Sequence, residues 1–282
     1  MSVARWSGML GLGAIAAQIA YPLTSGAGRD LVTVVVVLAL AAASVLHAAA
    51  TRGTPWTLGL LVVTALGGFG AELLGTATGV PFGTYSYDGT GRLGPELAGV
   101  PVLIGLAWTA GAYPAWCAAA RVVRTRQRAR WVRTVGLAAA GLAGWDLYLD
   151  PQLVADGHWT WAVRDAGLPG VAQVPVSNYL GWLLVALVMA ALLAAVTVAS
   201  PRTAATHRSD AVPLALFCWT WLGSALAHAV FLGMPYSAVY GAMVMGVVGV
   251  PLLRSLRPVG LMTCRGRGAG VPARVDAPLP RR

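Results

Sequence analysis

One stretch of the chain is repeated 74 residues later. The first copy, residues 70–108, reads GAELLGTATGVPFGTYSYDGTGRLGPELAGVPVLIGLAW, and the second, residues 144–182, reads GWDLYLDPQLVADGHWTWAVRDAGLPGVAQVPVSNYLGW. Eleven of the 39 aligned positions are identical, and their first-copy members are Gly70, Leu73, Val80, Gly83, Pro95, Ala98, Val100, Pro101, Val102, Leu106 and Trp108. Because proline and tryptophan seldom match by chance, we interpret the pattern as an internal duplication.

The two copies also place chemically active residue types at equivalent positions. Glu72 aligns with Asp146, and residues 85–87 (Tyr-Ser-Tyr) align with residues 159–161 (Trp-Thr-Trp). Each copy reads as an apolar helix with a carboxylate near its end, an aromatic loop, and a second apolar helix that starts at Val-Pro-Val. We therefore expect two helical hairpins that superpose about an axis near the membrane normal, with Glu72 and Asp146 facing one shared cavity.

The composition of the chain indicates a membrane protein. It is 57% hydrophobic and 11% charged, with a mean hydropathy of +0.69, which is more apolar than a soluble domain requires. Apolar stretches of spanning length recur along its whole length. We predict helices over residues 6–24, 31–50, 57–77, 99–120, 132–150, 178–199, 212–232 and 237–254.

These helices predict an all-α fold, namely a polytopic membrane helix bundle of about eight transmembrane helices. Within it we expect a tandem, same-orientation repeat of two-helix hairpins, with repeat units over residues 57–120 and 132–199. Residues 1–257 are predicted to form a single transmembrane domain. Residues 258–282 are rich in glycine, proline and arginine, and we predict a disordered, basic cytoplasmic tail there.

The placement of arginine predicts the orientation of the bundle. Six arginines fall between the fourth and fifth predicted helices: Arg121, Arg124, Arg126, Arg128, Arg130 and Arg133. By the positive-inside rule this connection is cytoplasmic, which puts both termini in the cytoplasm and leaves only Arg29, Arg92 and Arg164 outside. We predict a multi-pass protein of the cell membrane. The formal charge of +10 then reflects topology and attraction to membrane lipids, not nucleic-acid binding.

Four ionisable side chains are predicted to lie at one depth in the outer half of the membrane: Glu72, Asp146, Asp150 and His228. Asp146 and Asp150 are four residues apart and so share a helical face, and we expect Pro151 to end that helix. An ionisable group inside the bilayer costs about 2.5–3.5 kcal/mol, which favours a functional role over a structural one. We predict that Glu72, Asp146 and Asp150 are catalytic and that His228 binds substrate.

Two aromatic pairs flank these acids in the sequence. Tyr85, Tyr87, Trp159 and Trp161 could form an interfacial belt, the usual role of such residues at this depth, or they could line a site where ring faces stabilise a cation. Their paired placement beside predicted buried acids favours the site. Asn178 is a candidate polar anchor for substrate. The three cysteines have no metal-ligand spacing, so no metal site is predicted.

Five ordered motifs are similar to those of one known family. They are residues 79–87 (GVPFGTYSY), 97–101 (LAGVP), 146–151 (DLYLDP), 157–161 (GHWTW) and 174–182 (VPVSNYLGW). As a set they resemble the CruF-type carotenoid hydratases, which include carotenoid 1,2-hydratase-like enzymes and bisanhydrobacterioruberin hydratases. The resemblance runs from about the second predicted helix to the eighth. It implies a multi-span membrane enzyme that adds water to the terminal double bond of an acyclic carotenoid end group.

That activity agrees with the chemistry predicted from the residues. Hydrating a trisubstituted alkene to a tertiary alcohol needs an acid that protonates carbon, a pocket that tolerates a cation, and a base that deprotonates water; it needs no cofactor. Buried carboxylic acids and aromatic rings supply these parts. The expected partners are a lipid-soluble carotenoid, water and membrane lipids, with other carotenoid-pathway enzymes as further candidates.

Two other functions stay open on the sequence alone. The spacing of Asp146 and Asp150 resembles a magnesium–diphosphate motif, which would suit an intramembrane prenyltransferase or carotenoid elongase, although this motif is predicted to face the outer side. A duplicated fold with acids inside the membrane is also typical of transporters. In that case the chain would carry a carotenoid or lipid without changing it.

Overall fold

The computed structural model describes residues 2–123, 129–163, 167–200 and 209–256. Within these residues the chain forms eight helical rods, five of which are long and apolar enough to cross a membrane. The all-α bundle is therefore confirmed. The first two rods are α1 (Val3–Ala20), followed by a 3-10 turn η1 (Tyr21–Leu23), and α2 (Gly26–Arg52). The third consists of α3 (Thr54–Leu61), η2 (Val62–Leu66) and α4 (Gly67–Thr78), and the next three are α5 (Leu103–Val122), α6 (Ala129–Ala155) and α7 (Val176–Ala199). The seventh consists of α8 (Ala211–Leu226) and η3 (Ala227–Phe231), and the eighth is α9 (Pro235–Leu256).

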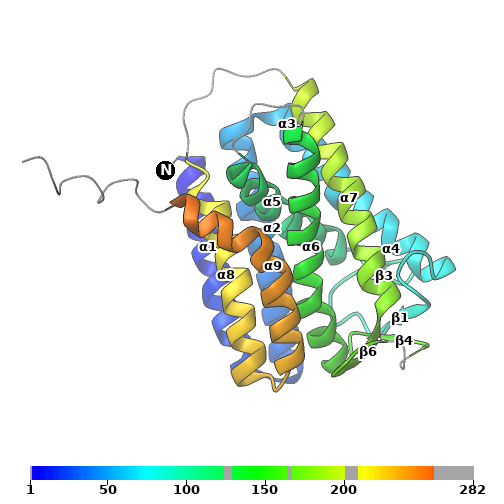
Figure 1. Cartoon of the computed structure of the whole chain (residues 1–282). Helices are drawn as coiled ribbons and strands as arrows, with labels where there is room; N and C mark the ends of the chain where they lie inside the picture. The colour runs from blue at the N-terminus through cyan, green and yellow to red at the C-terminus, as the bar shows by residue number, and fades with distance from the viewer. Residues whose placement is uncertain (1, 124–128, 164–166, 201–208, 257–282) are drawn as a thin grey trace, which may run out of the picture.

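The rods lie side by side, with the short strands gathered at one end of the bundle (Figure 1). We call this the strand-bearing end. The start of α1 and the end of α9 lie toward the opposite end (Figure 1), as an even number of spans requires. The predicted tail over residues 258–282, and the arginines at 124, 126, 128 and 164, lie outside the described residues.

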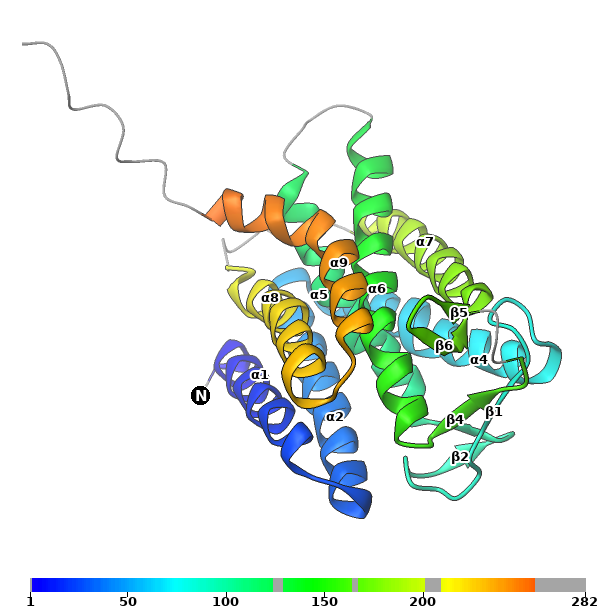
Figure 2. The same ribbon diagram turned by 60° about the horizontal axis from the view of Figure 1, so that its bottom comes forward.

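Six short strands close the strand-bearing end as three antiparallel pairs. They are β1 (Tyr85–Tyr87) with β4 (Trp159–Trp161), β2 (Glu96–Leu97) with β3 (Val100–Pro101), and β5 (Gly167–Leu168) with β6 (Val171–Pro175). Figure 2 shows β1 and β4 side by side beyond the ends of the helices. The aromatic loops expected in the two sequence copies are therefore structured, and with the other short strands they form a cap over this end of the bundle.

The β1–β4 pair joins the aromatic motifs of the two sequence copies. Tyr85 lies opposite Trp161, and Tyr87 lies opposite Trp159. A shift of 74 residues converts each of these pairs into the other. An antiparallel pair with this register has a local twofold axis through its centre, so the pairing supports the predicted pseudo-twofold relation between the copies.

Several predicted helix boundaries are wrong, and the helix expected from residue 31 already begins at Gly26. The helix expected from residue 99 begins at Leu103, because the preceding residues form the β2–β3 hairpin. The helix expected to end at Pro151 continues to Ala155. Proline has no N–H to donate to the carbonyl four residues earlier, but the Ser237 hydroxyl donates instead to the Leu147 oxygen at 2.5 Å. A side chain of α9 thus replaces the missing backbone bond.

Small residues let α6 approach its neighbours closely. A Cβ atom on Gly241 would lie 2.4 Å from the Tyr148 ring, and one on Gly144 would lie 2.8 Å from the Met245 side chain. These contacts bring α6 and α9 together, as small residues commonly do between helices in membranes. The central helices α5 and α6 contribute Trp108, Asp146 and Asp150, all of them buried, to the site described below.

The hydroxyl of Ser237 should stabilise the bundle because it completes the interrupted helix α6. We expect Ser237→Ala to lower the free energy of unfolding by about 1 kcal/mol, measured by thermal denaturation in detergent. In a Pro151→Ala background the backbone N–H is restored, so the same substitution should cost clearly less. An equal cost in both backgrounds would show that the contact with Leu147 does not matter.

Candidate active site

Glu72 lies near the end of α4 and is held by three uncharged donors. Its side chain is buried, with 5% of the residue exposed. One carboxylate oxygen accepts hydrogen bonds from the hydroxyls of Tyr85 and Tyr87, the latter at 2.9 Å, and the other accepts from the Trp108 indole N–H at 3.1 Å. Hydrogen bonds of this kind stabilise a carboxylate in a site where water is scarce.

The second acidic group is a pair on one face of α6. Asp146 and Asp150 both accept hydrogen bonds from the side-chain amide of Asn178, which lies in the first turn of α7. The bond to Asp146 measures 2.9 Å. Asp150 also accepts from the Trp159 indole N–H at 3.1 Å. The expectation that both aspartates share a helical face, with Asn178 as a polar anchor beside them, agrees with this geometry.

A stacked tryptophan pair joins the two copies of the repeat. Trp108 and Trp182 occupy equivalent positions in the two copies, and their rings stack with centroids 3.9 Å apart and planes at 17°. Gly68 makes room for this pair, since a Cβ there would lie 2.4 Å from the Trp108 ring. Neither ring was predicted to be a site residue, although the presence of tryptophan at the same position in both copies could have indicated it.

The aromatic residues of β1 and β4 form a wall beside the acids. Tyr85 stacks on Trp161 with centroids 5.5 Å apart, and Tyr87 meets Trp159 edge-on at the same separation. The Trp161 indole N–H donates to the Phe82 carbonyl at 3.0 Å, which fixes its ring. All four rings line the same cavity.

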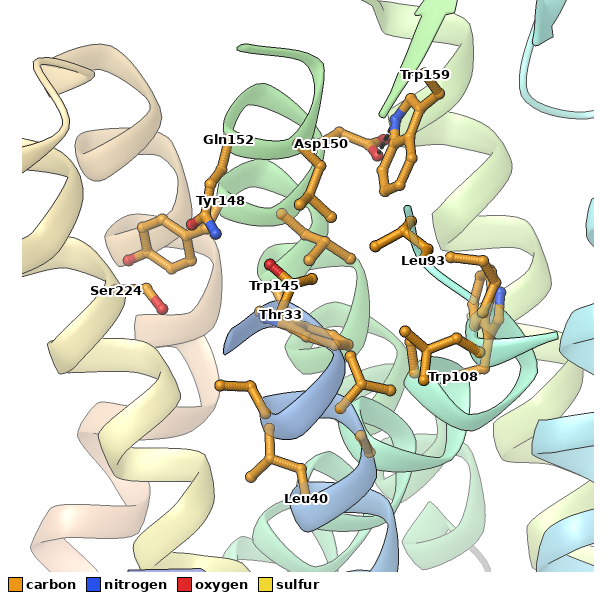
Figure 3. A pocket seen from close by; sticks show the side chains of 18 of the residues that line it. Thr33, Leu40, Leu93, Trp108, Trp145, Tyr148, Asp150, Gln152, Trp159 and Ser224 are labelled. Atoms are coloured by element: carbon orange, nitrogen blue, oxygen red, sulfur yellow. Dashed lines mark hydrogen bonds between the residues drawn. The ribbon is translucent and has the colours of Figure 1, made fainter. Parts of the chain in front are cut away.

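One cavity of about 120 Å³ joins these groups, and both Glu72 and Asp150 line it. Figure 3 shows Asp150, Trp159 and Trp108 along one side of it, with Tyr148 and Ser224 across from them. The four predicted aromatic residues and Asn178 also contribute to its wall. The lining is mainly apolar, which suits a hydrocarbon ligand whose reacting atoms need a few well-placed polar groups.

Two predicted site residues do not reach this cavity. Asp146 is fully buried behind Asn178, and its second oxygen has no hydrogen-bond partner among the described residues. His228 is also fully buried; it contacts the Gln152 amide at 3.2 Å and the Ser237 hydroxyl at 3.0 Å. We therefore correct the expectation that Glu72 and Asp146 face one cavity, because the aspartate that lines it is Asp150. His228 instead supports α6 near its proline.

Ion pairs tie the cap to the bundle. Arg92 lies between β1 and β2. It binds the Asp30 carboxylate of α2 with contacts of 2.7 and 3.0 Å and donates to the Asp156 carbonyl at 3.1 Å. Arg29 binds the Asp156 side chain at 2.7 Å. His158 is buried beside Asp30; burial and the nearby Arg92 lower the pKa of its ring. Sequence reasoning did not foresee these contacts, because the partners are far apart along the chain.

The fold and the site together define a membrane helix bundle with buried carboxylic acids at a cavity lined mainly by aromatic and other apolar side chains. A family model described as "Carotenoid biosynthesis protein" matches residues 31–249. The chain belongs to this family, which confirms the resemblance drawn from its motifs.

A curated relative provides a more specific comparison. The bisanhydrobacterioruberin hydratase of Haloarcula japonica is 34% identical over 125 residues, which is 44% of this chain. The match spans 40% of the length of that protein. No solved structure matches the chain.

The contacts of Arg92 with Asp30 and Asp156, here called the tether, should hold the β1–β4 pair over the site. We expect Arg92→Met to speed hydrogen exchange roughly tenfold at the amides of that pair, because charge-assisted bonds to Asp30 and Asp156 are lost and local opening becomes easier. Exchange measured by mass spectrometry in lipid nanodiscs tests this. Arg254→Met, on an exposed side chain of α9, is the matched control. Unchanged protection in Arg92→Met would contradict the role assigned to the tether.

Proposed function

We propose that the protein is a carotenoid hydratase, which adds water to the terminal C=C bond of an acyclic end group to give a tertiary alcohol. The observation that carries this proposal is the position of Glu72 and Asp150. The two acids come from different copies of the repeat and line one aromatic, mainly apolar cavity. The Haloarcula relative is named a hydratase, which is in accord with this chemistry.

The reaction takes up a proton at the start and releases one at the end. The acid first protonates the less substituted alkene carbon, which leaves a tertiary cation on its neighbour. A water oxygen then bonds to that cation, and a base removes the extra proton from the new hydroxyl group. One proton enters and one leaves, so the sum is the addition of one water molecule, with no change in redox state and no cofactor.

Asp150 is the proposed proton donor. Asp146 and Asp150 are bridged by one amide group of Asn178, and two carboxyl groups this close in a buried site hold a shared proton more readily than two full charges. Asp150 lines the cavity, while Asp146 is fully buried and is not among the residues that line it. Asp146 therefore acts through Asp150, as a positioning residue that keeps a proton in the pair.

Glu72 is the proposed base. Its three donors, Tyr85, Tyr87 and Trp108, are neutral and favour the carboxylate form. Burial raises the pKa of the Tyr85 and Tyr87 hydroxyls above their usual range, so they remain hydrogen-bond donors and do not compete for the proton. A carboxylate held in this way can accept the proton that the attacking water releases.

The aromatic wall is proposed to stabilise the cation between these two steps. Ring faces of Tyr and Trp attract a positive charge and cannot capture it as a nucleophile would, because their electrons are held in the ring. The stacked pair of Tyr85 and Trp161 and the edge-on pair of Tyr87 and Trp159 surround the space beside Glu72. Water then remains the nucleophile that ends the reaction.

The proposed setting is the cell membrane, with both termini in the cytoplasm and the strand-bearing end outside. Arginine placement supports this orientation. The substrate is dissolved in the lipid, and water reaches the acids from the strand-bearing end. Such a site needs an opening to the lipid on one side, for the substrate, and a polar cap on the other, for water.

Removing either cavity acid should abolish most of the activity. We expect Glu72→Gln and Asp150→Asn each to lower the rate at least ~100-fold, because each removes a group that takes part in proton transfer. The assay is expression in a lycopene-producing host, followed by mass analysis of the pigments for added water at matched protein levels. Both variants should fold, since an amide is less costly to bury than a charge.

A matched control is Asp210→Asn, since Asp210 lies at the other end of the bundle beside Arg52. It should leave the rate within about twofold of wild type if general acid–base catalysis is confined to the cavity. Near wild-type hydration by both cavity variants would refute the carboxylate mechanism. Loss of activity in the control as well would point to a general fault in folding.

A further inference from the structure

The cavity that holds Glu72 and Asp150 has a second arm that reaches the side of the bundle. Its far wall is formed by Gln18 of α1 and by one face of the α8–η3 rod. The residues on that face are Trp219, Gly223, Ser224 and Ala227. All five are half-buried, whereas Glu72 and Asp150 are buried. The arm therefore opens between α1 and α8.

This opening faces hydrocarbon. Exposed apolar side chains surround it on both helices: Ile19 is 54% exposed on α1, and Leu222 and Leu226 are 49% and 58% exposed on α8. The rod Ala211–Phe231 is long and apolar enough to cross a membrane. A gap bordered in this way on a membrane-spanning helix opens to lipid tails and not to water.

The opening exists because α1 and α8 pack tightly over only part of their length. Toward the start of α1, Gly11 lies against Leu216 and Val212; a Cβ there would meet their side chains at 3.5 and 3.7 Å. Nearer the strand-bearing end, a hydrogen bond of 2.9 Å from the Trp219 indole N–H to the Gln18 side chain joins the two helices. Beyond it the α8 face carries only small residues toward the cavity.

The size of the cavity makes such an opening necessary. A dry cavity of about 150 Å³ holds one benzene molecule, and this cavity measures about 120 Å³. It can therefore take the end group of a long isoprenoid hydrocarbon but not the whole molecule. The remainder of the chain must leave the cavity while the end group is bound. Of the lining described above, the arm between α1 and α8 is the part that reaches lipid.

We infer that the gap between α1 and α8 is a binding groove for the conjugated polyene chain of the substrate, which lies there while its end group reaches Glu72 and Asp150. The inference rests on the proposed function, since that function supplies the ligand. The flat rings of Trp219 and Tyr148 pack against the polyene. Gly223 and its small neighbours leave the width that a linear chain needs.

Gly223→Leu tests the groove. A Cβ at this position would already lie 3.1 Å from the Trp219 ring, so a leucine fills the opening. The matched control is Gly13→Leu, also a glycine within a helix, where nothing lies within 4 Å of the added Cβ. Binding is read without turnover, from quenching of tryptophan fluorescence when lycopene is titrated into the full-length protein in lipid nanodiscs.

We expect Gly223→Leu to weaken lycopene binding at least tenfold and Gly13→Leu to change it less than twofold. Hydration of myrcene, a C10 hydrocarbon with the same terminal alkene, should persist in Gly223→Leu, because so short a molecule does not use the groove. Equal lycopene binding by Gly223→Leu and wild type would overturn the inference. If Gly223→Leu fails to fold, Ser224→Leu on the same wall must give the same loss.

The two proposals fail in different ways. A wild-type protein that binds lycopene but never hydrates it would refute the proposed reaction, and the binding comparison between the two glycine variants would still decide the groove. A protein that hydrates lycopene normally with Gly223→Leu would refute the groove and leave the reaction intact.

Discussion

The structure depends on the requirement that a carboxylic acid buried in a membrane protein must be hydrogen-bonded. Leaving such a group unpaired costs several kcal/mol, so the partners of each acid determine where distant parts of the chain must lie. Glu72 of α4 draws its donors from β1 and α5, and Asp150 of α6 draws its donors from β4 and α7. Because β1 also pairs with β4, the two acidic groups and the cap form one connected unit. The tether from Arg92 to Asp30 then fixes that unit on α2.

The predicted duplication would account for an acid at the same place in each copy. The stacked Trp108 and Trp182 and the symmetric β1–β4 register support a pseudo-twofold axis through the site. The equivalent acids, however, have different surroundings. Glu72 lines the cavity, whereas Asp146 is buried and shares the Asn178 amide with Asp150, one helical turn further along α6. In the proposed mechanism this asymmetry matters, because one group donates a proton to the alkene and the other accepts a proton from water.

Much of this arrangement could be predicted from the sequence, because spacing along a helix and alignment between copies are local properties. They correctly indicated the membrane bundle. They also pointed to Glu72, Asp150, Asn178 and the four aromatic residues, which line one cavity in the structure. Properties that depend on contacts between distant helices could not be predicted. Pro151 does not end α6, because the Ser237 hydroxyl of α9 replaces the missing backbone hydrogen bond to Leu147. His228 contacts Gln152 and does not line the cavity. Asp146 is buried beside Asn178. The axis relating the two hairpins stays a prediction that the strand register supports.

The central claim is that a carboxylic acid protonates carbon and that water supplies the new hydroxyl group. Isotope labelling tests it most directly. Purified protein in nanodiscs is given lycopene in D₂O or in water labelled with ¹⁸O, and the product is analysed by mass spectrometry after exchangeable hydrogens are washed out. The account predicts one non-exchangeable deuterium on the carbon next to the alcohol carbon, and one ¹⁸O in the hydroxyl group. A hydroxylated product whose oxygen does not come from water, or one without carbon-bound deuterium, would contradict it.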